Sequence, residues 1–291
     1  MSLNHLGLVL LINIVWGLTF LVGKWGVTQM PPIFFSGLRF LFLAVMLLPW
    51  LRLYRGQMKD IMVIGLTAGV LQFAFFYWGM QQAADITPVA IMAQVHVPIS
   101  AVFAVLILKE RMHLRTLIGT ILAFGGVMIL GFDPIVLEYI EAMVWIVFGS
   151  VAFSLSVIYM RKVQGLGVFG LQAWVAIISA PVLMIISFFI EDRQLPSLAA
   201  ADWRGISSIF YTALASSIIG HGGMYYLLQR YPVTMISPFM LLAPVIGILS
   251  GVYLYDDVVT WRLLFGGLVT LFGVAVISVK RFPGFKKARL L

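Results

Sequence analysis

The hydrophobic pattern divides the chain into ten apolar runs separated by short polar segments. Nearly all of them are about 17 to 25 residues long, enough for a helix to cross a hydrocarbon core of about 30 Å. The longest intervening segment, residues 191–205, leaves no room for an inserted soluble domain. We therefore predict an all-α integral membrane protein with ten transmembrane helices, at residues 6–27, 32–51, 61–83, 87–108, 114–131, 140–163, 171–190, 206–231, 234–255 and 261–279.

The pattern in the first half of the chain returns in the second half. Pro98 laid on Pro244 pairs Leu108 with Leu254 and Glu110 with Asp256. Further echoes pair Gly119 with Gly266, Gly126 with Gly273, Trp16 to Phe20 with Phe153 to Val157, Lys24 with Arg161, and Tyr77, Trp78 and Gln81 with Tyr225, Tyr226 and Gln229. Five spans per half is an odd number, so the second half enters the membrane upside down. We predict two inverted five-helix repeats, residues 1–135 and residues 136–291, the second ending in a basic cytoplasmic tail.

Composition agrees with membrane insertion and excludes several other classes. The chain of 291 residues is 62% hydrophobic and 10% charged, with a mean hydropathy of +1.06, whereas soluble proteins carry about 25% charged residues. Its net charge of +8 lies in short loops and the tail, so we expect no nucleic-acid partner. The absence of cysteine excludes disulfides and thiolate metal sites. No glycine-rich run ends in Gly-Lys-Ser or Gly-Lys-Thr, so ATP hydrolysis is not expected. His96 and His221 are isolated and lack the ligand cluster that a metal site needs, so we expect no metal, and we expect no cofactor.

The distribution of Lys and Arg predicts the orientation. With the N-terminus inside, the inner loops and tail hold 14 of the 19 basic residues, and the outer loops hold three. Basic residues are retained on the cytoplasmic side. We therefore expect both termini in the cytoplasm.

Several of these residues also resemble a known family. They are Trp16-Gly17 with Phe20 and Lys24, Arg39 in the second span, the stretch from Pro98 to Glu110 followed by Gly119 and Gly126, and the second copy from Pro244. In these features and in its ten spans, the chain is similar to the EamA family of the drug/metabolite transporter superfamily. It departs from that pattern at Asp256-Asp257 and at Phe153, which stands where a tryptophan is common. The resemblance implies a bacterial inner-membrane exporter of amino acids and other small metabolites. It also implies a central cavity lined by spans one, three, four, six, eight and nine, with spans five and ten at the edge.

The fourth span carries the first candidate site. Pro98 lacks a backbone N–H and crowds the preceding turn, so we expect a kink that frees the carbonyl of Gln94. Pro244 predicts a matching kink in the ninth span, and the two prolines are candidate hinges. An imidazole ordinarily titrates near neutrality, so His96 is a candidate for contact with substrate or with a proton. The alternative is a neutral imidazole that is hydrogen-bonded to a neighbouring helix.

The other candidate substrate-binding residues lie on the predicted cavity helices. His221 stands among glycines that permit close approach. Arg39 lies deep in the second span, where we expect it to pair with backbone carbonyls or with a substrate carboxylate. Lys24 is closer to the surface, and we expect its amine to reach that surface. The remaining candidates are the aromatic residues and the amide, which suit an amphipathic solute but also fill bundle interiors: Trp16, Phe20, Tyr77, Trp78, Tyr225 and Gln94.

These features favour a secondary transporter that moves small metabolites, amino acids or related amphipathic compounds, outward by alternating access. Cationic drugs and nucleoside- or sugar-type metabolites are alternative substrates. A membrane enzyme would need a polar cluster at an interface, for which Lys109-Glu110-Arg111 with His113 is the nearest match. A channel would need a continuous polar face along several spans. The expected partners are a small-molecule substrate and membrane lipid, and the chain is expected to be a monomer or a homodimer.

Overall fold

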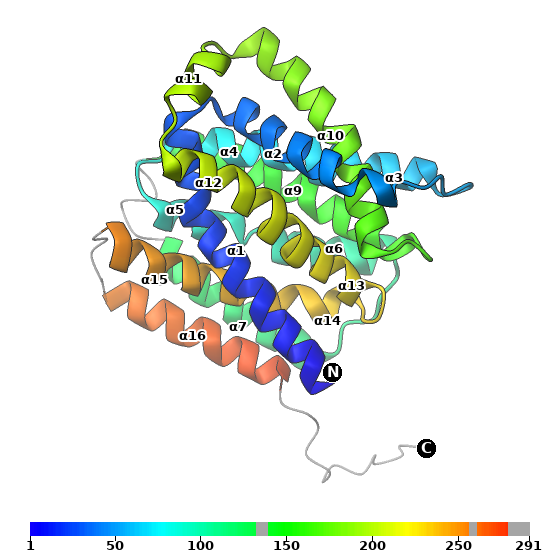
Figure 1. The fold of residues 1–291 in the computed structure, drawn as a ribbon. Coiled ribbons are helices and arrows are strands. Elements are labelled where there is room, and N and C mark those ends of the chain that lie inside the picture. Colours follow the sequence, from blue (N-terminus) through cyan, green and yellow to red (C-terminus); the bar gives the residue numbers. More distant parts are fainter. Residues whose placement is uncertain (132–138, 256–260, 279–291) are drawn as a thin grey trace, which may run out of the picture.

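The computed structural model describes residues 1–131, 139–255 and 261–278, and all regular elements in these ranges are helical (Figure 1). The all-α prediction is therefore confirmed for the described residues. Seven helical segments are long and apolar enough to cross a membrane: Leu3–Gln29, Pro32–Trp50, Met58–Gln82, Ile86–Ile107, Ile140–Lys162, Val168–Ile190 and Val233–Leu254. These seven segments coincide with seven of the ten predicted spans. The Asp256-Asp257 pair and the basic tail from Lys280 lie outside the described residues.

The other three predicted spans are also helical. Residues 114–131 and 261–279 correspond to α7 (Leu114–Gly131) and α16 (Trp261–Ser278), whose apolar segments are shorter. Residues 206–231 correspond to α12 (Trp203–Tyr211), the π-helical η3 (Thr212–His221) and α13 (Gly222–Leu228), which follow one another without a gap. Ten membrane crossings therefore stay a prediction.

The remaining elements subdivide the long segments. They are α1 (Leu3–Gln29), α2 (Pro32–Leu47), the 3-10 turn η1 (Leu48–Trp50), α3 (Met58–Ile64), the π-helical η2 (Gly65–Leu71), α4 (Gln72–Gln82), α5 (Ile86–Ala93), α6 (His96–Ile107), α9 (Ile140–Lys162), α10 (Val168–Ile190), α11 (Gln194–Ala200), α14 (Val233–Ile236), the 3-10 helix η4 (Ser237–Leu242) and α15 (Ala243–Tyr255). The short helix α11 lies within the segment 191–205 that the sequence suggests is only a loop.

Two helices, α1 and α9, form the centre of the packing. Helix α1 packs against α12, η3 and α15, while α9 packs against α4, α5 and α6. Helices α2 and α10 pack together, and α7 and α16 form a pair at the edge of the bundle (Figure 1). Large apolar side chains such as Leu106, Phe188 and Leu268 point away from the protein interior. Such an apolar surface suits a lipid environment, where backbone groups must be satisfied within the helices.

Glycines permit the close contact between α7 and α16. A Cβ added at Gly126 would lie 2.6 Å from the carbonyl oxygen of Gly266, and one at Gly273 would lie 2.7 Å from that of Gly119. Both distances are far below van der Waals contact, so only glycine fits there. The four glycines that the sequence repeat pairs with one another thus form one seam.

Hydrogen bonds join the two halves of the chain at both ends of the bundle. At the end that we call the Gln29 end, Gln29 and Asp202 exchange two bonds, from Gln29 Nε2 to Asp202 Oδ1 (2.8 Å) and from Asp202 N to Gln29 Oε1 (2.9 Å). At the opposite Gln57 end, Gln57 donates to the carbonyl of Gln164 (2.9 Å), and Gln164 N donates to Gln57 Oε1 (2.8 Å).

One glutamate at each end caps a helix of the other half. The Glu191 carboxylate accepts from the N–H groups of Ile33 and Phe34, at 2.8 Å each, at the start of α2. The Glu110 carboxylate accepts from the N–H groups of Val233 and Thr234, at 3.0 Å each, at the start of α14. A carboxylate suits a helix N-terminus because the first N–H groups have no partner within the helix.

Candidate functional site

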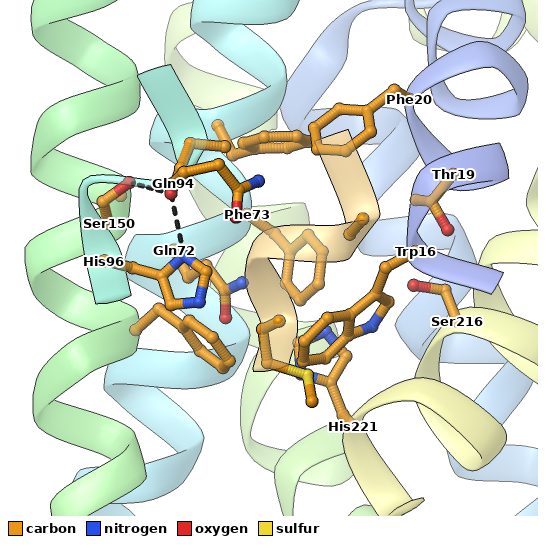
Figure 2. A pocket seen from close by; sticks show the side chains of 16 residues that line it. Trp16, Thr19, Phe20, Gln72, Phe73, Gln94, His96, Ser150, Ser216 and His221 are labelled. Carbon is orange, nitrogen blue, oxygen red and sulfur yellow. Dashed lines mark hydrogen bonds between the residues drawn. The ribbon is translucent and has the colours of Figure 1, made fainter. Parts of the chain in front are cut away.

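A cavity of about 80 Å³ lies at the centre of the bundle (Figure 2). It is enclosed by α1, η3, α4, the junction of α5 and α6, α9, and the junction of η4 and α15. Its lining residues are Trp16, Thr19, Phe20, Gln72, Phe73, Phe76, Ala93, Gln94, His96, Gly149, Ser150, Phe153, Ser216, His221, Met240 and Ala243. The first nine belong to the first half of the chain and the last seven to the second half. Among the described residues, none of the side chains that line the cavity is a carboxylate.

The backbone before Pro98 shapes one wall of this cavity. Helix α5 ends at Ala93 and α6 begins at His96, so Pro98 lies in the first turn of α6, where its missing N–H is tolerated. The carbonyl of Gln94 accepts from the N–H of Val97 at 2.9 Å. The prediction that Pro98 frees the Gln94 carbonyl is therefore wrong, because that carbonyl takes the N–H that would otherwise bond to Ala93.

Side chains satisfy the carbonyl of Ala93 instead. His96 Nδ1 lies 2.8 Å from this oxygen, and Ser150 Oγ donates to it at 3.2 Å. A carbonyl oxygen cannot donate, so Nδ1 carries the hydrogen and the neutral ring presents a lone pair on Nε2. His96 Nε2 is buried and has no hydrogen-bond partner in the described part of the chain. Because Pro98 has no N–H to give to Gln94, the N–H of Val97 bonds to Gln94, and the Ala93 carbonyl is left to His96. This bond fixes the orientation of the imidazole.

Three further polar atoms of the lining are buried without a partner among the described residues. They are the Oε1 atoms of Gln94 and Gln72 and the Nε1 atom of Trp16. Gln94 Nε2 donates to the carbonyl of Ala90 at 3.1 Å, which directs its Oε1 away from the helix. A buried polar atom without a hydrogen bond costs about 1 to 3 kcal/mol. These unpartnered atoms favour a polar occupant of the cavity, such as water or part of a solute.

Aromatic rings form most of the remaining walls. The centroid of Phe153 lies 5.9 Å from Trp16, 5.1 Å from His96 and 5.5 Å from His221. The rings of Trp16 and His221 are 5.1 Å apart. These distances place both histidines in one aromatic cluster, with Phe153 between them.

Arg39 lies behind this aromatic wall and does not line the cavity. Its side chain is fully buried, and its guanidinium carbon lies 4.1 Å from the ring centroid of Phe73, which does line the cavity. It donates to Tyr77 Oη at 3.0 Å, to the carbonyl of Thr212 at 2.6 Å and to Ser217 Oγ at 2.8 Å. Within the described ranges no acidic side chain forms an ion pair with it. The expected contact with a backbone carbonyl is present at Thr212, in the π-helical η3 that ends at His221.

The structure brings together some of the predicted site residues and separates others. Trp16, Phe20, Gln94, His96 and His221 all line the cavity. Two of the remaining candidates are buried in packing contacts. Tyr77 binds Arg39, and Tyr225 Oη donates to the carbonyl of Leu166 at 3.1 Å. Trp78 lines a separate open hollow of about 460 Å³ at the Gln29 end, beside Glu191.

The predicted hinge Pro244 occupies the position that matches Pro98. It is the second residue of α15, and the 3-10 helix η4 runs directly into it. Residues Met240 and Ala243 of this junction line the cavity. The backbone is therefore irregular before both prolines, although a hinge motion stays a prediction.

Lys24 is held differently from its prediction. Its Nζ atom donates to the carbonyl of Met80 at 3.0 Å and also to that of Ala83, at the end of α4, and the residue is buried. The amine therefore caps the last carbonyls of a helix, where a cation is favourable. It does not reach the surface as expected.

Sequence reasoning missed several lining residues, among them Gln72, Phe73, Ser150 and Ser216. A signal was present for Gln72, since an amide in an apolar span usually faces the bundle interior. Ser150 and Ser216 gave a weaker signal, because serine is common in membrane helices. The matching of Trp16 with Phe153 was also a signal, because both rings line the cavity.

Comparisons with known proteins place this fold among transporters. The family model described as "EamA-like transporter family" matches residues 5–132 and again residues 140–279. The "Probable amino-acid metabolite efflux pump" of Escherichia coli (strain K12) is 27% identical over 277 residues, covering 92% of this chain and 93% of that protein. The protein of the same name from Salmonella typhimurium is 28% identical over 291 residues, covering 97% of each. A solved crystal structure superposes with a TM-score of 0.73 at 16% identity, covering 94% of this chain and 97% of the other, which shows a shared fold alone.

Proposed function

Because this chain belongs to the EamA-like transporter family, we propose that it is a secondary transporter that exports amino acids or related amphipathic metabolites across a bacterial inner membrane by alternating access. Membership in the family makes the chain a metabolite transporter and not an enzyme. The substrate class, the direction and the mechanism are the proposed part. The two relatives named as amino-acid metabolite efflux pumps support the first two.

The central cavity carries the proposal. It lies at the centre of the bundle, receives side chains from both halves of the chain, and contains four buried polar atoms that lack partners in the described residues. Solute sites of secondary transporters lie at the interface between repeats, near the middle of the membrane. The cavity volume of about 80 Å³ is well below the roughly 300 to 1,000 Å³ of common ligand pockets. Admission of a metabolite therefore requires the walls to move apart.

Several paired features support two inverted repeats, residues 1–135 and residues 136–291. Helix α1 packs on the eighth predicted span and α9 packs on the third, as a two-fold axis in the membrane plane requires. The π-helical stretches η2 and η3 occupy the centres of these two spans. Gln81 Nε2 donates to the carbonyl of Val27 at 2.9 Å, and Gln229 Nε2 donates to that of Met160 at 2.6 Å. The matched glutamines thus each join the third helix of a half to the first.

The hydrogen bonds at the two ends of the bundle are the contacts that would open and close in alternating access. The Gln29–Asp202 pair and Glu191 join the halves at one end, while the Gln57–Gln164 pair and Glu110 join them at the other. Both sets are formed in the present structure, together with a small cavity. In the proposed cycle one set breaks while the other holds, and the positive-inside distribution supports a cytoplasmic position for the Gln57 end.

Counterflow in proteoliposomes tests this function. Vesicles preloaded with an unlabelled amino acid should accumulate the same labelled amino acid transiently, at a rate that saturates with concentration. The experiment would cover the twenty proteinogenic amino acids, a nucleoside, a sugar and a cationic dye. Exchange of only the dye or the nucleoside would overturn the amino-acid assignment, and a flux that does not saturate would overturn the carrier mechanism.

A further inference from the structure

We propose that Gln72, Gln94 and His96 form an amine-binding wall, which takes the protonated primary amine of a zwitterionic solute. The inference rests on the proposed function and adds the chemical group that this wall recognises. The wall comprises Gln72 Oε1, Gln94 Oε1 and His96 Nε2, and these three atoms lie on the same side of the cavity in the view of Figure 2.

All three atoms of the wall are hydrogen-bond acceptors. The Oε1 atoms of the two glutamines accept only, and the bond from His96 Nδ1 to the Ala93 carbonyl leaves Nε2 with a lone pair. Gln94 is 2% exposed and His96 is 7% exposed, so bulk water does not satisfy them. A primary ammonium carries three N–H donors and no acceptor. Its donor number matches the three open acceptors, whereas a carboxylate offers no donor at all.

The opposite wall differs in character. Trp16 on α1 lies across the cavity from Gln94 and His96 in Figure 2, and its Nε1 packs against Gly220, where an added Cβ would lie 2.3 Å away. Behind Phe73, the guanidinium of Arg39 supplies a buried positive charge. The positive field of Arg39 therefore favours a carboxylate group over a second ammonium group in the cavity.

The charges of the lining select a net-neutral solute. None of the described residues that line the cavity is a carboxylate, so no lining side chain among them compensates a full positive charge that leaves water. A free amine or a quaternary cation would also approach the positive field of Arg39. A zwitterion brings its own carboxylate, which reduces both costs, and its side chain would contact the rings of Phe20, Phe76 and Phe153.

A ligand series on the purified protein tests this recognition. The amino acid that stabilises the protein most strongly in a thermal-shift screen serves as the parent. Equilibrium binding then compares the parent with its N-acetyl derivative, its deamino acid and its descarboxy amine. Each analogue should bind at least about tenfold more weakly than the parent, as expected for the loss of a hydrogen bond to a charged group. Equal binding of the N-acetyl derivative or the deamino acid would overturn the amine-binding wall, and equal binding of the descarboxy amine would overturn the zwitterion preference.

Variants of Gln94 assign the effect to the wall. Gln94→Leu should weaken binding of the parent amino acid about tenfold or more. Gln94→Glu has the same shape, so it should retain the affinity for the parent and raise the affinity for the descarboxy amine. Gln194→Leu is the matched control, since it makes the same substitution on α11, away from the cavity lining, and should leave the affinity for the parent unchanged. Unchanged parent affinity in a folded Gln94→Leu protein would overturn the assignment. Failure of every amino acid to bind or exchange would instead overturn the proposed function.

Discussion

The stretch before Pro98 and the stretch before Pro244 use the same backbone device for different chemistry. Each proline lies in the first turn of a helix, and the backbone before each one leaves regular α-helical geometry. At Pro98 the interruption carries Gln94 and His96, with two open acceptors on the cavity. At Pro244 the corresponding residues are Met240 and Leu242, which offer none. The backbone therefore follows the repeat at both junctions while the side chains differ, so the cavity has one polar wall and one apolar wall.

The largest expected effect comes from removing His96. His96→Ala deletes the acceptor Nε2, and Ser150 still bonds to the Ala93 carbonyl, so the helix junction persists. We expect transport to fall about 10- to 100-fold, with normal expression and monodispersity, because a bond to a charged group contributes about 1.5 to 3 kcal/mol. Leu242→Ala makes the same change at the matched position of the second half. It should alter transport less than about twofold, because Leu242 offers no hydrogen-bond acceptor and substitutions away from such groups have small effects. Counterflow in proteoliposomes measures both, and wild-type transport by His96→Ala would remove this residue from the site.

The neighbouring helices contact these two junctions in unequal ways, which gives the second prediction. Gly17 of α1 faces α15, where an added Cβ would lie 2.6 Å from Ile246 Cβ and 2.9 Å from the carbonyl oxygen of Ala243. At the matched position of α9, Ser154 Oγ donates to the carbonyl of His96 at 3.0 Å. Gly17→Ala should destabilise the protein by about 1 to 3 kcal/mol through overpacking. Ser154→Ala should cost only about 1 kcal/mol for one lost bond. Thermal unfolding in detergent checks the order, and equal losses would contradict it.

The two capping glutamates extend the comparison to the ends of the bundle. Loss of a cap costs about 1 kcal/mol, which corresponds to roughly a fivefold change in a closed-to-open ratio. Glu191→Ala should therefore expose the Gln29 end, and Glu110→Ala should expose the Gln57 end. Because the chain has no cysteine, single cysteines at Trp16 or His221 report access to reagents added from either side. Exposure of the same end by both variants would contradict the assignment of one cap to each end.

The smallest expected effect is a difference in acid sensitivity between the two reciprocal pairs. Hydrogen bonds from Gln29 and from the N–H groups of Gly205 and Arg204 hold the pKa of the Asp202 carboxyl below its usual value. The folded pKa is lower than the unfolded one, so this contribution is present above about pH 4 and is lost as the pH falls further. The Gln57–Gln164 pair has no group that titrates there. Asp202→Asn should therefore remove a small acid-dependent opening of the Gln29 end, measured by cysteine access between pH 7 and pH 3. An equal acid response in the variant would exclude Asp202 as its source.

The sequence predicts the positions of the helices well because long apolar runs admit few other structures in a membrane. It also locates Gln94 and His96, since polar residues beside a proline in an apolar span rarely face lipid. It does not predict which aromatic residues enter the cavity, because these helices are apolar on all sides and no periodicity distinguishes the inner face. Tyr77 and Trp78 are adjacent in the chain, yet one contacts Arg39 and the other lines a hollow at the Gln29 end.

The side-chain partners of Arg39 and the state of the Gln94 carbonyl could not be predicted from the sequence, for physical reasons. Two of the partners of Arg39, Thr212 and Ser217, lie more than 170 residues away in the chain, so local pattern cannot identify them. The Gln94 carbonyl is not free, because the N–H of Val97 bonds to it and not to the carbonyl of Ala93. The backbone carbonyl that loses its helical donor is therefore that of Ala93, one residue earlier in the chain.

The bond between His96 Nδ1 and the Ala93 carbonyl has one more consequence, for the source of energy. It leaves the imidazole a single lone pair facing the cavity, and one lone pair accepts one hydrogen at a time. At the proposed amine-binding wall, a proton that binds to Nε2 would turn this atom into a donor and exclude the amine, while a bound amine would block the proton. Mutual exclusion at one atom is the thermodynamic condition for antiport, in which an inward-moving proton and an outward-moving solute take turns on the same carrier.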